Sequence, residues 1–242
     1  MPDGRSLLLS AANDKGTVTA MRLDLATSAV TQLVDETNSG ALSPDGRLLY
    51  YVGLVPGAGA PAQRSRRLVA ADLTTRRERD LFVAPEGTRI SMQYARFEPN
   101  VQVTPDGKSV AFVIAPANGQ NATIMLAPVT GGPAKAIANS PADWNFTNVR
   151  LVGFSPGGEQ LIFTTVRGRG QENLEPATVW RVPVTGGPFT QLERPGSGQQ
   201  SMAVSFDGKR VAFTAGESAE ELWVMEDSTL QQRAATRAAP RR

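Results

Sequence analysis

The sequence contains neither histidine nor cysteine, so the side chains behind much hydrolytic and metal chemistry in proteins are missing. Without His, no Ser-His-Asp triad or HExxH zinc site can form, and no imidazole can act as a general base near neutral pH. Without Cys, a thiol nucleophile, a disulfide and a thiolate metal site are excluded as well. The chemistry left open is carboxylate, Lys, Tyr or Ser-Lys catalysis, or a hard cation bound by oxygens.

Three short motifs resemble functional sequences, but each departs from its pattern. Gly196-Ser197-Gly198 lacks the G-x-S-x-G spacing of a nucleophile elbow. Gly107-Lys108-Ser109 resembles the end of a P-loop, but Gln102 stands where the upstream Gly is required. Ser43-Pro44-Asp45-Gly46 approaches the Asp box of sialidases, but its Gly follows the Asp directly and no Thr-Trp follows. None of the three therefore predicts a catalytic or nucleotide site.

Charged residues cluster without the patterns of known ligand sites. The carboxylates on expected loops form no DxDxDG calcium motif; they are Asp35, Glu36, Glu172, Glu175, Glu217, Glu220 and Glu221. The arginine clusters have no interleaved aromatic residues and are expected to be solvated; they are Arg64, Arg66, Arg67, Arg76, Arg77, Arg79, Arg167, Arg169, Arg233, Arg237, Arg241 and Arg242. With 25 basic and 23 acidic residues in near balance, we expect no nucleic-acid partner, no cofactor and no metal site.

The elements that would position any site are indicated by a repeated turn tripeptide. The glycines lie 42, 61, 51 and 50 residues apart, which is the size of a four-stranded blade with loops of variable length. Pro sets φ of the first turn position, Asp bonds to the backbone ahead, and Gly accepts the positive φ that closes a hairpin. The five copies are Pro2-Asp3-Gly4, Pro44-Asp45-Gly46, Pro105-Asp106-Gly107, Pro156-Gly157-Gly158 and Phe206-Asp207-Gly208.

Apolar residues at fixed offsets from each turn predict the strands of the unit. A short inner strand precedes four of the turns, at residues 40–42, 101–103, 151–154 and 202–204. A second strand follows each turn, at residues 7–9, 49–51, 110–112, 161–163 and 211–213. A third strand carries the column Leu23, Ala71, Ala127, Val182 and Met225, and an outer strand carries Leu33, Leu81, Ile137 and Leu192.

The repeats resemble those of TolB-like β-propellers, most clearly in residues 43–51, 104–112 and 205–213. The resemblance implies an all-β propeller over residues 1–227, with a basic flexible tail at 228–242. The five units are about 1–39, 40–98, 99–148, 149–198 and 199–227. Such repeats occur in stand-alone periplasmic proteins and in regulatory propellers of larger hydrolases, so the resemblance implies a fold and no single function.

Aromatic residues and variable loops give the remaining site predictions. Trp180 and Trp223 fall in one repeat column and are expected in the cores between blades. Trp144 lies outside the repeat and is a candidate contact at the channel mouth, with loop packing as the alternative. The loops between Val52 and Arg67 and between Thr165 and Glu175 are expected to share one face, to be the most mobile ordered parts, and to form the binding side.

A set of structural repeats without a catalytic constellation predicts a non-enzymatic propeller that binds or scaffolds a protein or peptide. One alternative is a gating propeller of a larger enzyme, as in prolyl oligopeptidase or tricorn-type proteases. The other is a carbohydrate- or metal-binding propeller that uses channel carboxylates. The resemblance favours a periplasmic or exported location, although Leu7-Leu8-Leu9 is too short for a signal-peptide core and no stretch could span a bilayer.

The two ends of the repeat pattern predict an incomplete ring of six or more blades. Unit 1 begins inside its own turn, and unit 5 runs out after residues 221–227. An arc of units leaves one inter-blade face exposed, here nearest to Met21, Leu23, Trp223 and Met225. We expect a further N-terminal blade, or a partner, to cover that face.

Overall fold

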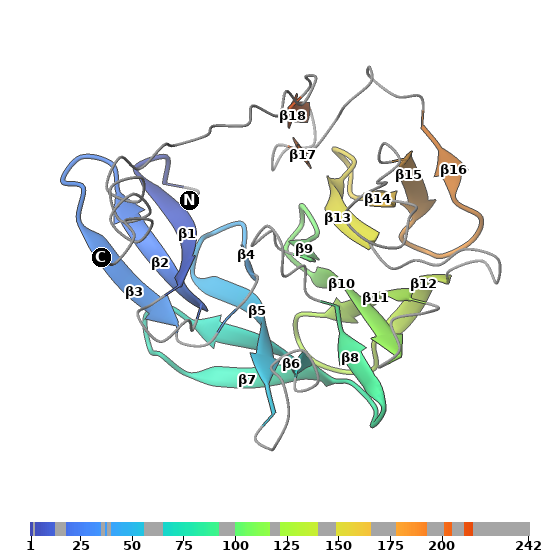
Figure 1. Ribbon diagram of the computed structural model, residues 1–242, viewed down its shortest axis with the longest axis horizontal. Coiled ribbons are helices and arrows are strands. Elements are labelled where there is room, and N and C mark those ends of the chain that lie inside the picture. The colour runs from blue at the N-terminus through green and yellow to red at the C-terminus, as the bar shows by residue number, and fades with distance from the viewer. Residues whose placement is uncertain are drawn as a thin grey trace, which may run out of the picture.

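The computed structural model describes most of the repeat region, and every regular element in the described residues is a β-strand. These residues are 1, 3–12, 18–34, 37, 40–55, 65–91, 100–116, 122–139, 149–165, 178–192, 201–204 and 211–214. They include no helix with the length and apolar character that a bilayer span needs. The strands form separate antiparallel sheets that follow one another around an arc (Figure 1).

Each sheet corresponds to one predicted unit. Unit 1 has three strands, β1 (Ser6–Ala12), β2 (Val18–Asp24) and β3 (Val30–Val34). Unit 2 has four, β4 (Gly40–Leu42), β5 (Leu48–Leu54), β6 (Ser65–Asp72) and β7 (Glu78–Val83). Unit 4 also has four, β13 (Val149–Phe154), β14 (Gln160–Thr165), β15 (Thr178–Pro183) and β16 (Thr190–Gln191). The described part of unit 5 is the hairpin β17 (Ser201–Val204) and β18 (Val211–Thr214).

Unit 3 contains one strand more than the repeat pattern predicts. Its regular strands are β9 (Val101–Val103), β10 (Ser109–Pro116), β11 (Thr123–Pro128) and β12 (Lys135–Asn139). The additional β8 (Thr88–Ile90), which the sequence division counts with unit 2, pairs with the far end of β10. β10 is long enough to pair with β9 through residues 110–112 and with β8 through residues 114–116.

The predicted order of inner, second, third and outer strand is confirmed in units 2, 3 and 4. The inner strands β4, β9 and β13 line the centre of the arc, and β7, β12 and β16 lie outside (Figure 1). In the described residues, unit 1 begins with β1 at the edge of its sheet, and none of its strands pairs with unit 5. The described strands therefore form an arc of blades, without a detected closure of the ring.

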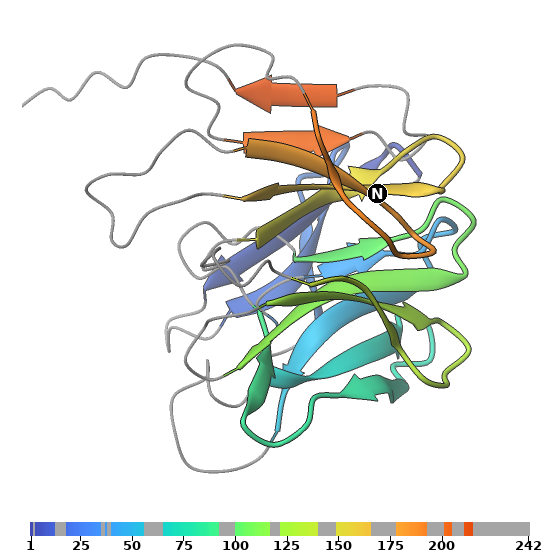
Figure 2. The ribbon, with the colours of Figure 1, turned by 90° about the vertical axis from the view of Figure 1, so that its right-hand side faces the viewer.

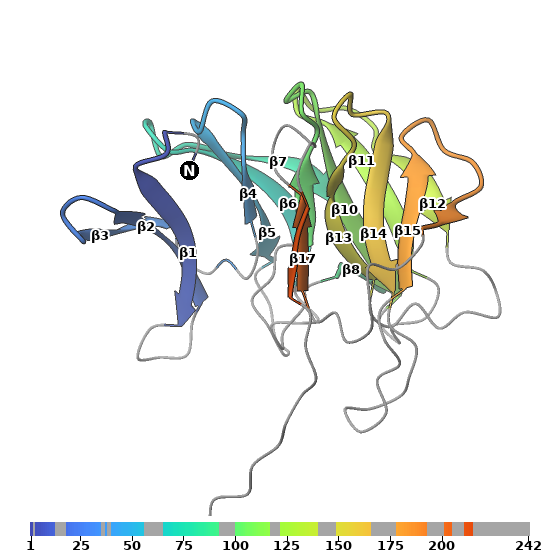
Figure 3. The ribbon, with the colours of Figure 1, turned by 90° about the horizontal axis from the view of Figure 1, so that it is seen from above.

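The strands of the sheets end on two opposite sides of the arc, which are easiest to see in Figure 3. Leu48, which follows the Pro-Asp-Gly turn, pairs with Asp72, which precedes the outer turn, so both turns lie at the same edge. At the other end of these strands, Leu54 pairs with Ser65 on either side of the connection between β5 and β6. We call the side of the arc with the turns the turn edge, and the side with the connections between second and third strands the loop edge. Both names refer to strand ends and not to outermost strands, and the side view in Figure 2 shows the same separation.

The hydrophobic cores lie between successive units rather than within them. One sheet face, which we call the leading face, packs on the preceding unit, and the opposite trailing face packs on the following unit. The leading face of unit 2 (Leu49, Tyr51, Val69, Ala71) packs on Leu8, Ala20 and Leu33 of unit 1. Unit 3 packs Val110, Phe112, Met125 and Ala127 on Tyr50, Val52, Leu68 and Ala70. Unit 4 packs Leu161, Phe163, Trp180 and Val182 on Ala111, Val113, Ile124 and Leu126.

The predicted core position of Trp180 is confirmed, since its side chain is buried in this last interface. Its indole N–H donates to Thr165 Oγ1 at 2.9 Å, so the one polar atom of the ring is satisfied inside the core. Phe189 packs edge-on against the same ring, with 5.3 Å between centroids. Trp223, in the same repeat column, lies outside the described residues.

Candidate binding surface

The turn edge is built from hairpins whose polar groups bond to one another. In unit 3, Thr104 Oγ1 donates to Asp106 Oδ1 at 2.7 Å, and the N–H of Lys108 donates to the same oxygen at 3.0 Å. In unit 2, Ser43 Oγ and the N–H of Arg47 make the equivalent bonds to Asp45. The glycines that follow, Gly46 and Gly107, have φ of 72° and 71°. Asp207 and Gly208 of unit 5 lie outside the described residues.

Unit 1 closes its turn in a related way. Asp3 Oδ1 accepts the backbone N–H of Arg5 at 2.9 Å and of Ser6 at 3.1 Å, and Gly4 has φ of 62°. These backbone bonds, together with the Ser6 hydroxyl, hold the pKa of Asp3 below its ordinary value. The pKa of Asp106 is lowered first by the Thr104 hydroxyl and then by the N–H of Lys108. The turn carboxylates are therefore stabilised as anions by bonds within their own hairpins.

The outer turns at this edge also use their polar groups internally. In units 1 and 2, Asp24 and Asp72 each accept two backbone N–H groups from the turn that follows, which lowers both pKa values. Units 3 and 4 replace this arrangement with Pro-Val-Thr-Gly-Gly-Pro, in which the N–H of Gly131 bonds to the carbonyl of Pro128 at 3.1 Å. Two different turn sequences thus join the third and outer strands in hairpins of the same length.

Arginines of unit 2 connect it to both neighbouring units, which the sequence did not indicate. The Arg76 guanidinium donates to the carbonyl of Leu33 in unit 1, and that of Arg79 donates to the carbonyl of Val129 in unit 3. Arg76 adopts the left-handed conformation, φ 59°, which is unusual for a residue with a side chain. Unit 2 therefore contacts the outer strand of unit 1 through Arg76 of its outer turn, and the outer turn of unit 3 through Arg79 of β7.

The prediction of solvated loops is wrong for Arg66 and Arg67. Both lie in β6, because β5 continues through Val52 to Leu54 and the strand pairing extends to Ser65. Arg66 Nη2 donates to the carbonyl of Ala84 at 2.8 Å, and Arg67 pairs with Asp80 at 2.8 Å. The arginines at 64, 167, 169, 233, 237, 241 and 242 lie outside the described residues.

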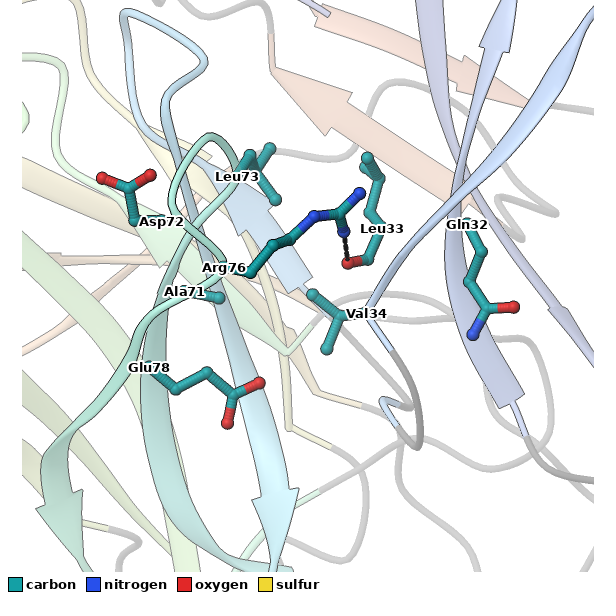
Figure 4. A pocket seen from close by; sticks show the side chains of 8 residues that line it. All are labelled: Gln32, Leu33, Val34, Ala71, Asp72, Leu73, Arg76 and Glu78. Atoms are coloured by element: carbon teal, nitrogen blue, oxygen red, sulfur yellow. Dashed lines mark hydrogen bonds between the residues drawn. The ribbon is translucent and has the colours of Figure 1, made fainter.

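A groove of about 360 Å³ separates units 1 and 2 on their outer side (Figure 4). Its polar groups are Gln32, Asp72, Arg76 and Glu78, and the Arg76 side chain points across it toward Leu33. Glu78 Oε1 accepts the Tyr51 hydroxyl at 2.8 Å, and burial together with this carboxylate raises the pKa of the phenol. Asp72 already accepts bonds from its own turn, Arg76 contacts unit 1, and Glu78 binds Tyr51 within unit 2, so the groove is a structural junction.

The loop edge carries the segments that differ most between units. The strand ends that bound the two predicted recognition loops, Leu54 and Ser65 in unit 2 and Thr165 and Thr178 in unit 4, all lie at this edge. The connections themselves, residues 56–64 and 166–177, lie outside the described residues, as does Trp144. The predicted sharing of a face is thus supported by the flanking strand ends, while the predicted mobility stays a prediction.

At the start of β9, on this edge, Asn100 joins two units through its side-chain amide. Nδ2 donates to the carbonyl of Val149 at 3.0 Å, and Oδ1 accepts the N–H of Leu151 at 3.0 Å. The side chain is buried, 1% exposed, and it binds the backbone of β13 in unit 4 as a neighbouring strand would. A repeat alignment misses this residue, because the position before an inner strand is treated as loop.

The described residues contain no group of three or more His, Cys, Asp or Glu that could bind a metal ion. The inner strands β4, β9, β13 and β17 include neither Asp nor Glu in their sequences. The loop carboxylates singled out in the sequence, at 35, 36, 172, 175, 217, 220 and 221, lie outside the described part of the chain. The described inner strands are thus composed of apolar and neutral residues together with Arg150.

No protein-family model matches the sequence, and no curated protein matches it. Solved structures do match the arc of sheets. TolB from Acinetobacter baumannii has a TM-score of 0.63 at 19% identity, covering 88% of this chain and 47% of that one. A putative TolB from Agrobacterium tumefaciens has a TM-score of 0.56 at 18% identity, covering 78% of this chain and 61% of that one. The fold is that of a TolB-like β-propeller.

The same propeller fold supports different functions. An oligogalacturonate lyase in complex with manganese has a TM-score of 0.53 at 16% identity, covering 89% of this chain and 69% of that one. This TolB-like chain spans about half of the Acinetobacter protein, at 47% of its length. Since these matches include a lyase as well as proteins named TolB, the fold leaves the activity undetermined.

Proposed function

We propose that this TolB-like propeller is a non-catalytic module that binds a protein or peptide at its loop edge. The observation that carries the proposal is the difference between the two edges. At the turn edge, the hairpins of four units have the same lengths and bond their polar groups internally. At the loop edge, the connections between the second and third strands span residues 13–17, 55–64, 117–122 and 166–177, so their lengths differ. Variation confined to one face of a repeat array is typical of a recognition surface.

The chemistry of the chain supports binding over catalysis. With no His and no Cys, a nucleophile would have to be activated by Lys, Tyr or a carboxylate. The carboxylates at Asp3, Asp24, Asp45, Asp72 and Asp106 accept hydrogen bonds from their own turns, which lowers their pKa values and makes them poor proton donors near neutral pH.

Two alternatives remain as outcomes of the test. A gating propeller would act on a hydrolase domain in the same polypeptide. A carbohydrate- or metal-binding propeller would need convergent carboxylates near the centre of the arc, and the acid-free inner strands offer it no support.

The absence of cysteine allows a direct test, because one introduced thiol is a unique attachment point. A photo-crosslinker would be placed at the loop edge in Thr123→Cys or Thr178→Cys, and at the turn edge in Thr27→Cys or Thr130→Cys as matched controls. We expect both loop-edge positions to crosslink the same polypeptide in cells, and the turn-edge positions to do so much less. Equal crosslinking from both edges would contradict a loop-edge site.

The purified chain should also show no peptidase, esterase or glycosidase turnover above background. Turnover that persists through purification, and is lost on substitution of a single carboxylate, would overturn the non-catalytic assignment. The crosslinking experiment and the turnover assay report independently on the binding surface and on the absence of catalysis.

A further inference from the structure

The leading face of unit 1 differs in its exposure from the leading faces of units 2, 3 and 4. In units 2 to 4 the residues at its four central positions are all buried, from 0% to 9% exposed. They are Leu49, Tyr51, Val69, Ala71, Val110, Phe112, Met125, Ala127, Leu161, Phe163, Trp180 and Val182. In unit 1 the same positions are held by Leu7, Leu9, Met21 and Leu23, of which Leu7 is 44% exposed and the others are half-buried.

Two further apolar residues of unit 1 extend this face. Leu25 is 53% exposed, whereas the equivalent Leu73 of unit 2 packs into the core against unit 1. Val30 is 57% exposed and pairs with Leu23 across β2 and β3. Among the described residues, three of the four exposed large hydrophobic side chains thus lie in unit 1, and the fourth, Val83, lies on β7. Such a concentration on one face indicates an interaction surface.

The backbone of the turn gives a second, independent observation. In units 3 and 4 the turn glycine meets a proline of the preceding unit: a Cβ on Gly107 would lie 3.1 Å from Pro44, and one on Gly158 would lie 3.3 Å from Pro105. At Gly4 no described atom lies within 4 Å of the same position, although its φ of 62° matches the others. The position that a proline occupies in units 3 and 4 is thus not filled by any described residue in unit 1.

We propose that the leading face of unit 1, formed by Leu7, Leu9, Met21, Leu23, Leu25 and Val30, docks a further propeller blade of the same repeat type. The occupant follows from the interfaces already present, since the leading faces of units 2, 3 and 4 are each covered by the trailing face of the preceding blade. That blade presents aliphatic residues to the leading face and places a turn proline on Gly4. The six residues carry no charge, so an apolar sheet fits them better than a charged partner does.

A single thiol on this face tests the proposal in the full chain expressed in its native cells. A photo-crosslinker at Val30→Cys is expected to join a peptide from a Pro-Asp-Gly-type repeat that is not among residues 1–242, identified by mass spectrometry. Val83→Cys, of similar exposure on β7, is the matched control and is expected not to form this product. A crosslink to residues 199–227, to a second copy of the chain or to a protein without such repeats overturns the proposal, as does the absence of any crosslink.

A charge on the face gives the complementary measurement. Leu7→Lys should reduce recovery of the repeat-containing polypeptide by about tenfold or more, because the equivalent Leu49 of unit 2 is fully buried and a lysine at this position would enter an apolar interface. Val83→Lys should change recovery less than about twofold. Equal recovery with both variants, after both are shown to unfold at the same temperature as the parent chain, overturns the proposal.

Discussion

The ring of Pro44 in unit 2 lies against Gly107 in unit 3, where an added Cβ would come 3.1 Å from both its Cγ and its Cδ. Pro105 stands in the same relation to Gly158, at 3.3 Å from Cδ. The Pro-Asp-Gly turn therefore does more than close a hairpin. Its proline lies against the unit that follows, and its glycine lies against the unit that precedes, so the repeated tripeptide also forms part of the packing between blades.

This contact predicts unequal effects for two glycine substitutions. Gly4→Ala and Gly107→Ala both place a side chain in the left-handed region, which costs about 1–2 kcal/mol of folding free energy. Gly107→Ala should lose about 1 kcal/mol more, because its methyl group must displace Pro44 in a packed contact. Urea unfolding of the two variants measures the difference. The extra loss should disappear when Gly107→Ala is combined with Pro44→Ala, and equal losses for the two single variants would refute the contact.

Most of the strand order could be predicted from the sequence, because the turn tripeptide and the alternation after it are both local signals. Leu49 to Tyr51 and Val110 to Phe112 lie in the second strands as expected. β8 could not be predicted, since Thr88–Ile90 is a short segment that pairs, among the described strands, with the far end of β10. The inter-unit contacts of Pro44 and Asn100 were also missed, because an alignment compares equivalent positions and does not show which unit each side chain meets.

The outer turns predict a second pair of effects. Ser28 and Arg76 occupy equivalent positions with φ of 57° and 59°, where units 3 and 4 have glycine. Ser28→Gly should change the free energy of unfolding by less than about 1 kcal/mol, since relief of strain is offset by entropy of the unfolded chain. Arg76→Gly should be less stable than Ser28→Gly by about 1 kcal/mol, because it also removes the bond to Leu33. Thermal unfolding compares them, and matching midpoints would show that the bond contributes nothing.

The turn carboxylates predict a dependence of stability on pH. Because the pKa of Asp106 is lower in the folded chain than its ordinary 3.8, its contribution is present above that value and is lost as the pH falls through the folded pKa. Asp106→Asn cannot titrate, although its amide oxygen can still accept from Thr104. Its unfolding temperature should therefore fall less than that of the parent between about pH 5 and pH 2.

The cause of this shift can be tested separately. Thr104→Val removes the hydroxyl that lowers the Asp106 pKa most, so the carboxyl should titrate at a higher pH in that variant. The carboxyl-carbon NMR shift of Asp106 reports the titration directly. An unchanged titration in Thr104→Val would mean that the hydroxyl bond is not the main cause.

Among the candidate residues of the loop edge, Asn100 was the one without any sequence signal, and its geometry makes a strong prediction. Its amide donates to the Val149 carbonyl and accepts from the Leu151 N–H, each at 3.0 Å, so only a group with one donor and one acceptor fits both. Asn100→Asp keeps the shape but turns an oxygen toward the Val149 carbonyl and buries a charge. We expect it to lower the free energy of unfolding by about 2–3 kcal/mol at neutral pH.

A neighbouring residue provides the control for this effect. Gln102 Nε2 reaches the Leu151 carbonyl only at 3.5 Å, and its side chain is half-buried. Gln102→Glu, which makes the same amide-to-acid change on β9, should therefore cost less than about 1 kcal/mol. The loss of unfolding free energy in Asn100→Asp should also become smaller as the pH is lowered, because a protonated carboxyl regains a donor for the Val149 carbonyl. If the two variants lose the same free energy of unfolding, or if the loss in Asn100→Asp does not change with pH, Asn100 does not join β9 to β13 through this pair of bonds.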